Sequence, residues 1–302
     1  MIDRALIGCS ADFMRVVHAA RLVAPTDATI LLQGEAGAGK ETLAREIHAL
    51  STRWQRPFLA LPSASVTPEL FDGSAGGAEA ATTLHPAAGG TLFLDEVADL
   101  TPAAQARLLS YFETGRVGTN GGEVLSLRVI GATATDLLQR VEAGAFRADL
   151  YHRLNVVPFD MPPLRQRAED IPLLLRHYGR DLGRALGRRP PSFSVSSMNL
   201  LKAYPWPGNV RELRNLCERL ILLLPGVTVR PENLPAEIRA PACSRGASGF
   251  RLPAGGIDLN RLEADVIRQA LDLAAGNRSR AARLLGITRD TLLYRIQKHG
   301  IA

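Results

Sequence analysis

Short apolar runs separated by helix-like segments dominate the first half of the chain. The runs predict buried strands at 29–32, 58–61, 90–96 and 127–133. A helix is expected at 16–23, before the first strand. Near-continuous apolar strands between helices are typical of a parallel sheet that is covered on both faces. We therefore expect an α/β fold with such a sheet over residues 1–170.

The pattern changes after Asp170. Leucines recur at helical spacing to about Leu224, which predicts a helical subdomain over residues 171–239. Residues 240–257 are rich in proline, glycine and serine, a composition typical of a flexible linker. The last segment, 258–302, has the spacing of a compact all-helical domain.

A glycine-rich loop follows the first predicted strand. Residues 34–42 read G-E-A-G-A-G-K-E-T, and the spacing fits G-x-x-x-x-G-K, although Glu41 stands where the strict pattern has Ser or Thr. Glycines let backbone N–H groups point at a phosphate, and the helix that follows adds its dipole and Lys40 its charge. An ordinary glycine-rich turn between strand and helix is the alternative. The candidate nucleotide-binding residues here are Gly34, Glu35, Gly37, Gly39, Lys40, Glu41 and Thr42.

Two carboxylates end the predicted strand at 90–96. Ligands of a parallel α/β sheet bind at the carboxyl ends of its strands, so Asp95 and Glu96 should lie beside the glycine-rich loop. One carboxylate could hold Mg²⁺ and the other could orient a water molecule. A solvated acidic turn is the alternative, and the glycine-rich loop upstream favours the nucleotide site.

With these motifs, nearly the whole chain resembles the AAA+ ATPases of the sigma-54-dependent bacterial enhancer-binding regulators, most of all the short members that lack an N-terminal receiver. The resemblance implies an AAA+ P-loop domain, a helical lid and a Fis-type helix-turn-helix domain. Glu41 is usual in that family. The matching stretches are 6–8, 34–41, 69–71, 89–96, 146–150, 153–156, 162–167 and 206–213.

The resemblance assigns roles to individual residues. Lys40 would bind phosphate, Asp95 would bind Mg²⁺, and Glu96 would position water, so ATP and Mg²⁺ are the implied cofactors. Arg211 would be the second sensor, a lid arginine that contacts phosphate.

Arg147 and Arg153 occupy the positions of the arginine fingers that reach a neighbouring subunit's nucleotide. Such residues stabilise charge on a transferring phosphoryl group, and arginines supplied in trans imply a closed ring. The alternative, without the family context, is a solvated helix face near Glu142 and Asp149.

Three departures from the family lie along one functional route. The G-A-F-T-G-A loop that binds the sigma-54 factor is missing from residues 72–88, which contain no aromatic residue. Ala134 replaces the asparagine of the first sensor, and Pro62 replaces the asparagine that pairs with the second acidic residue. We expect a regulator that binds ATP and assembles, yet cannot engage sigma-54 by itself. It would act through another polymerase form, as a repressor, or with an intact paralogue.

Two alternatives to this interpretation stay open. The chain could be an active ring ATPase that remodels sigma-54 polymerase, or a nucleotide-gated DNA-binding scaffold without hydrolysis. Whether ATP is hydrolysed is left open as well.

The tail has the pattern of a helix-turn-helix. Its first helix would bury Ala281, Ala282, Leu284 and Leu285, and its second would bury Leu292, Leu293 and Ile296. Gly286 would end the first helix and Thr288 would cap the second. It resembles the Fis-type DNA-binding domain; a basic helical pair that packs on another domain is the alternative. The candidate DNA-binding residues are Arg278, Arg280, Thr288, Arg289, Thr291, Tyr294, Arg295 and Lys298.

The preceding helix at 259–273 suits dimerisation, which predicts paired half-sites in double-stranded DNA. The apolar face on which this rests consists of Leu259, Leu262, Val266, Ala270 and Leu273.

Charge and cysteine content agree with this assignment. The net charge is +6 and the pI about 9.6, with six basic residues against Asp290 alone from Arg278 onward.

The cysteines (Cys9, Cys217 and Cys243) lie far apart, which argues against a disulfide framework or a zinc site. No secretory signal is recognisable, and the longest apolar run, 220–224, is too short to span a bilayer. We expect a cytoplasmic protein with no membrane contact.

Overall fold

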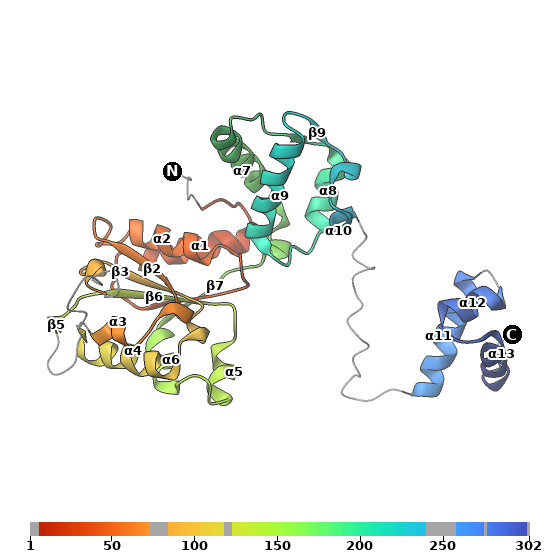
Figure 1. Cartoon of the computed structure of the whole chain (residues 1–302), viewed down its shortest axis with the longest axis horizontal. Coiled ribbons are helices and arrows are strands. Elements are labelled where there is room, and N and C mark those ends of the chain that lie inside the picture. The colour runs from red at the N-terminus through yellow and green to blue at the C-terminus, as the bar shows by residue number, and fades with distance from the viewer. Residues whose placement is uncertain (1–5, 73–83, 118–122, 240–257, 275–276, 301–302) are drawn as a thin grey trace. The chain divides into compact units, whose positions relative to one another are not determined.

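The computed structural model describes residues 6–72, 84–117, 123–239, 258–274 and 277–300, in two compact units, Met1–Ala242 and Cys243–Ala302. Figure 1 labels their elements. In the first unit the helices are α1 (Ala11–Val23), α2 (Lys40–Ala49), α3 (Glu69–Asp72), α4 (Pro102–Thr114), α5 (Leu137–Glu142), α6 (Ala148–Leu154), α7 (Ile171–Leu186), α8 (Val195–Ala203), α9 (Asn209–Leu223) and α10 (Ala236–Arg239). Its strands are β1 (Ile30–Gln33), β2 (Phe58–Pro62), β3 (Thr91–Asp95), β4 (Arg116–Val117), β5 (Glu123–Val124), β6 (Arg128–Thr133), β7 (Val157–Asp160), β8 (Ser192–Phe193) and β9 (Thr228–Val229).

Five parallel strands form the central sheet in the order β2-β3-β6-β1-β7. Successive residues of a strand face opposite sides, so Ile30 packs in the cluster under α1 and α2 while Leu31 packs in the cluster under α4 and α6. Figure 1 shows these two helical layers on opposite faces of the sheet. The expected parallel α/β core, covered on both faces, is confirmed.

Strand β7 was not foreseen. It pairs with β1 through Ile30–Val157 and Gln33–Asp160 and lies at the edge of the sheet. Pro158 sits in its middle, and proline is unfavourable in most strands because it cannot donate a ladder hydrogen bond. An edge strand needs partners on one side only, so the proline is tolerated here.

The helical lid, which contains α7 to α10, forms its own hydrophobic core around the fully buried Trp206. The indole Nε1 donates to the carbonyl of Leu201 over 2.8 Å, and its ring meets Tyr204 edge-on, with centroids 4.9 Å apart. The expected helical character is confirmed, with one addition. The lid also contains a short parallel pair, β8 with β9. This pair was not foreseen because each strand has only two residues.

Several expected boundaries change or cannot be compared. Helix α1 begins at Ala11, ahead of the expected 16, and the antiparallel pairing of β4 with β5 was not foreseen. The expected linker at 240–257 and residues 73–83 of the altered interval lie outside the described residues.

The second unit is a helical domain made of α11 (Leu259–Leu273), α12 (Arg278–Leu284) and α13 (Arg289–Lys298). Gly286 follows α12 with φ of 65°, and the Thr288 hydroxyl caps α13 by accepting from the Thr291 N–H. The expected helix-turn-helix is confirmed.

Two side-chain placements in this unit were wrong. Leu284 is 56% exposed rather than buried, because Ala281 and Ala282 supply the packed face of α12. Ala270 is buried inside the domain, whereas Leu259 and Leu273 are more than 70% exposed. The apolar face expected for dimerisation is therefore split, and part of it packs within the domain.

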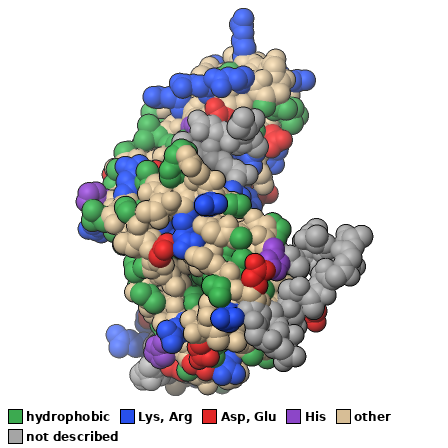
Figure 2. Space-filling view, turned by 90° about the vertical axis from the view of Figure 1, so that its left-hand side faces the viewer, with side chains coloured by type: hydrophobic (Ala, Val, Ile, Leu, Met, Phe, Trp, Pro, Cys, Tyr) green, Lys and Arg blue, Asp and Glu red, His purple; other side chains and the backbone are tan. Residues whose placement is uncertain are grey.

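Positive charge also gathers on the lid. Figure 2 shows Lys and Arg side chains at the top of that view. In the lid, Arg180, Arg184 and Arg188 of α7 and of the residues after it are exposed. Among the described helices, each is too short or too polar to cross a membrane.

Candidate functional site

The glycine-rich loop, residues 34–40, joins the end of β1 to the start of α2. Gly34, Gly37 and Gly39 have φ of 146°, 76° and 106°, values that side chains other than glycine rarely adopt. A Cβ on Gly34 would also lie 2.8 Å from the carbonyl oxygen of Met161. The loop therefore requires glycine, and the first N–H groups of α2, which have no partner within the helix, lie at its end.

Lys40 lies at the start of α2 and is only 6% exposed. Its ammonium donates to the carbonyl of Gly34 over 2.7 Å and to Glu96 Oε1 over 3.1 Å. The two motifs found in the sequence are thus side by side, as the parallel sheet predicted.

Asp95 ends β3, opposite Pro62 at the end of β2. Burial raises the pKa of Asp95 above its ordinary value; the charge of Glu96 raises it further, and Lys40 lowers it. A bound cation would stabilise the ionised form of a carboxylate in such surroundings. Magnesium uses one or two carboxylates together with phosphate oxygens, so this donor set suits it. Within the described residues no larger cluster of metal-ligating side chains occurs.

Glu96 has a left-handed backbone, with φ of 53°. Its Oε2 accepts from the backbone N–H of Ala134 over 2.7 Å. The sequence shows no side-chain donor at position 134, but the main chain supplies one. Sequence patterns carry no signal for this contact, because every residue except proline has an N–H.

The lid contacts the loop directly. A Cβ on Gly37 would collide with the carbonyl of Gly208 and lie 3.1 Å from Cβ of Arg211, so Arg211 lies beside the loop as expected. Arg211 also lowers the pKa of Asp95, against the larger effect of burial. Sequence reasoning missed Arg167, which is 2% exposed and donates to the carbonyl of Ala38 over 2.6 Å.

Arg147 and Arg153 are exposed at the start and near the end of α6. The guanidinium of Arg147 bonds both oxygens of Asp149, over 3.0 and 2.7 Å, which raises the pKa of Arg147. Neither arginine is brought to the glycine-rich loop within this chain by a described contact, so their finger role stays a prediction.

Three sequence profiles match the chain. A sigma-54 interaction domain matches residues 6–160, an AAA+ ATPase lid domain 165–248, and the bacterial regulatory protein Fis family 259–299. The transcriptional regulatory protein ZraR of Salmonella typhimurium is 41% identical over 97% of this chain and 68% of its own length.

The chain belongs to the sigma-54 activator family of AAA+ DNA-binding transcription regulators. NtrC of Rhizobium meliloti is 36% identical over 98% of this chain and 70% of its own. The crystal structure of NtrX from Brucella abortus in complex with ADP has a TM-score of 0.72 and 33% identity, over 99% of this chain and 70% of that one.

In the DNA-binding domain of this family member, the candidate residues divide into two groups. Arg278, Arg280, Arg289 and Tyr294 are exposed. Arg295 and Lys298 instead turn toward Glu263 of α11, at 2.6 and 3.6 Å, and His299 approaches the same carboxylate at 2.8 Å. Sequence reasoning missed Glu263, which contacts residues more than 30 positions away.

This pairing leads to a prediction for DNA binding. Each phosphate contact contributes about −0.9 to the slope of log K against log salt. We expect Arg289→Ala to reduce the magnitude of that slope by about 1. Arg295→Ala should leave the slope unchanged and lower the thermal stability of the full chain, since the contact that it removes is with Glu263. Titrations of duplex DNA at several salt concentrations measure both slopes. An equal reduction of the salt slope in the two variants would contradict the division of the candidate residues into DNA-facing and Glu263-facing groups.

A second prediction concerns Asp95. Because its pKa is raised in the folded protein, its ionised form costs stability at neutral pH; this cost shrinks as pH falls below the folded pKa and is gone below the unfolded pKa. Asp95→Asn should therefore raise the melting temperature at pH 7 with chelator present, and the gain should shrink in acid. The exposed Asp99→Asn is the control. A lower melting temperature for Asp95→Asn at pH 7 would contradict the electrostatic account.

Proposed function

We propose that this regulator binds ATP and Mg²⁺ at the glycine-rich loop and controls transcription without engaging sigma-54 by itself. The observation that carries the second part is the sequence of residues 72–88, which has neither the G-A-F-T-G-A motif nor an aromatic residue to anchor a partner. Regulation would proceed through another polymerase form, by repression, or together with an intact paralogue in the cytoplasm.

The geometry of the loop supports nucleotide binding. Lys40 would turn its ammonium from the loop carbonyls to the β- and γ-phosphates, and Asp95 would hold the Mg²⁺ ion. When bound, that ion neutralises charge on the phosphate oxygens. The likeness to NtrX from Brucella abortus, which was crystallised in complex with ADP and with ATP, gives independent support.

The lack of a side-chain donor at Pro62, beside the acidic pair, favours binding over rapid turnover. Both oxygens of Glu96 are engaged, one by Lys40 and one by the Ala134 N–H. Pro62, at the neighbouring strand end, offers neither a side-chain donor nor an N–H. When Lys40 turns to the phosphates, Oε1 of Glu96 becomes free, while Oε2 can keep the Ala134 N–H.

Assembly would complete the site. Arg147, the residue before α6, and Arg153, within α6, are exposed, so they are available to a neighbouring subunit's nucleotide in a ring, once Arg147 leaves Asp149. In the DNA-binding domain, the exposed Leu259 and Leu273 are suited to pairing α11 with a second copy, which would place two recognition helices on paired half-sites.

The second candidate function is an active ATPase that remodels sigma-54 polymerase. It is favoured by the same site, because Lys40, Asp95 and Glu96 are all present and close together. A slow turnover is compatible with either function, so hydrolysis alone does not distinguish them.

Transcription with purified components separates the two functions. We expect the protein to bind ATP, and Lys40→Ala to weaken that binding at least about tenfold, or 1.4 kcal/mol. With sigma-54 holoenzyme, ATP and a promoter that carries its binding sites, no open complex should form. Open complexes that require ATP and are lost in Glu96→Gln would contradict the proposal and establish the remodelling ATPase. Tight ATP binding without turnover would identify the scaffold.

A further inference from the structure

An acidic residue, Glu35, stands inside a loop that is built to bind anions. Its carboxylate is held by two partners on the lid side. Arg165 forms a bidentate pair with it, over 2.8 and 2.7 Å, and Asn209 Nδ2 donates to its Oε2 over 3.1 Å. Arg165 above all, then Asn209, lowers the pKa of Glu35, so the carboxylate stays charged. Released from these partners, it would repel a phosphate.

Asn209 uses every polar atom of its amide. Its Oδ1 accepts from the Leu164 N–H over 2.8 Å, and its Nδ2 donates to the carbonyl of Ala36 and to Glu35, over 3.1 Å each. The side chain is completely buried, and φ of 51° places it in the left-handed region, which asparagine tolerates better than most residues. The next N–H, of Val210, donates to the carbonyl of Gly37 over 3.0 Å.

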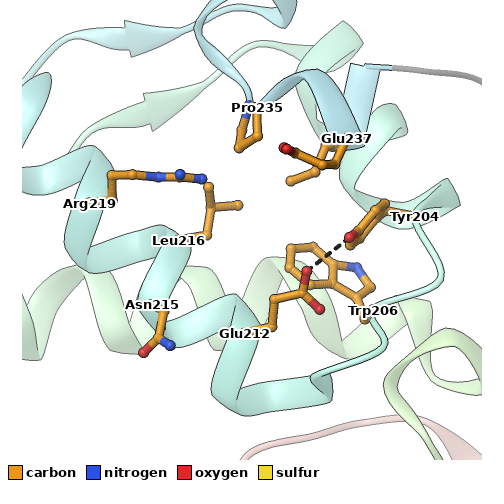
Figure 3. A pocket seen from close by; sticks show the side chains of 9 residues that line it. Tyr204, Trp206, Glu212, Asn215, Leu216, Arg219, Pro235 and Glu237 are labelled. Atoms are coloured by element: carbon orange, nitrogen blue, oxygen red, sulfur yellow. Dashed lines mark hydrogen bonds between the residues drawn. The ribbon is translucent and has the colours of Figure 1, made fainter.

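The lid turn that carries Asn209, residues 206–209, is itself fixed from behind. Glu212 accepts from the Tyr204 hydroxyl and from the Gly208 N–H, over 2.9 Å each, and Figure 3 shows Tyr204 and Glu212 joined across the buried Trp206. The cavity of about 310 Å³ at this place is lined by lid residues alone. The turn that carries Asn209 is therefore held by hydrogen bonds within the lid.

We infer that Asn209 and Arg165 are positioning residues for the nucleotide. Both draw Glu35 away from the phosphates, and Asn209 also bonds the carbonyl of Ala36, which leaves the N–H groups of the loop for the ligand. The inference rests on the proposed ATP binding and adds to it two residues outside the glycine-rich motif. It also explains how a family member can carry a carboxylate in a phosphate-binding loop.

A charge change at Asn209 tests the inference. Asn209→Asp keeps the acceptor for Leu164 but loses the donor and places a second carboxylate against Glu35. We expect it to weaken binding of fluorescent mant-ATP by the full chain at least tenfold. Adding Glu35→Gln should recover at least threefold of that loss, since the glutamine amide can donate to the new carboxylate. Asn215→Asp, an equivalent change on the same helix without a described contact to the loop, is the control and should leave binding unchanged.

The outcomes separate cleanly. Wild-type affinity in Asn209→Asp would overturn the inference while ATP binding stands, and so would a loss that Glu35→Gln fails to restore or that Asn215→Asp shares. Far-UV circular dichroism and melting curves of each variant show whether a loss of mant-ATP affinity reflects unfolding. If a variant loses affinity because it unfolds, and Glu35→Gln does not reverse this, the result also counts against the inference. If the wild-type chain binds no mant-ATP and equals Lys40→Ala, the proposed function fails, and the inference fails with it.

Discussion

Asn209 joins the lid to the loop that faces the nucleotide. Its single amide bonds Leu164, Glu35 and Ala36, and the adjacent Val210 N–H bonds Gly37. The close approach of Gly208 to Gly37 leaves no room for a side chain between them. Because packed elements shift between discrete arrangements rather than deforming continuously, a lid that rotates must break these bonds together. The conformation of the loop and the position of the lid therefore change together.

Much of the fold could be predicted from sequence, and the reasons are local. The apolar runs at 58–61 and 127–133 have lengths and flanks that identify strands, and glycines at 34, 37 and 39 identify a loop. Strand β7 was missed because Pro158, in its middle, is a residue that argues against a strand. Asn209, Arg167 and Glu263 were missed for another reason: their partners lie far away in the chain, and a single sequence carries no signal for such pairings. The donor to Glu96 was missed because it is a backbone N–H.

Two sets of positions in the AAA+ domain and its lid contrast with each other. Residues that would bind nucleotide (Lys40, Asp95 and Arg211) lie together around the glycine-rich loop, while positions that would couple nucleotide to sigma-54 differ from the family. The structure also modifies one of those differences, because the Ala134 main chain contacts Glu96 without an asparagine side chain. ATP would then act mainly by joining core and lid, and through them subunits, rather than by driving work on a polymerase.

Hydrogen exchange with and without ATP tests this coupling most directly. Amides of the glycine-rich loop and of the first turn of α9, including Val210, open together if the two elements form one unit. The account predicts equal protection of both peptides in the absence of nucleotide and an equal increase when ATP is added. Protection that rises in the loop while the α9 peptide is unchanged would contradict it.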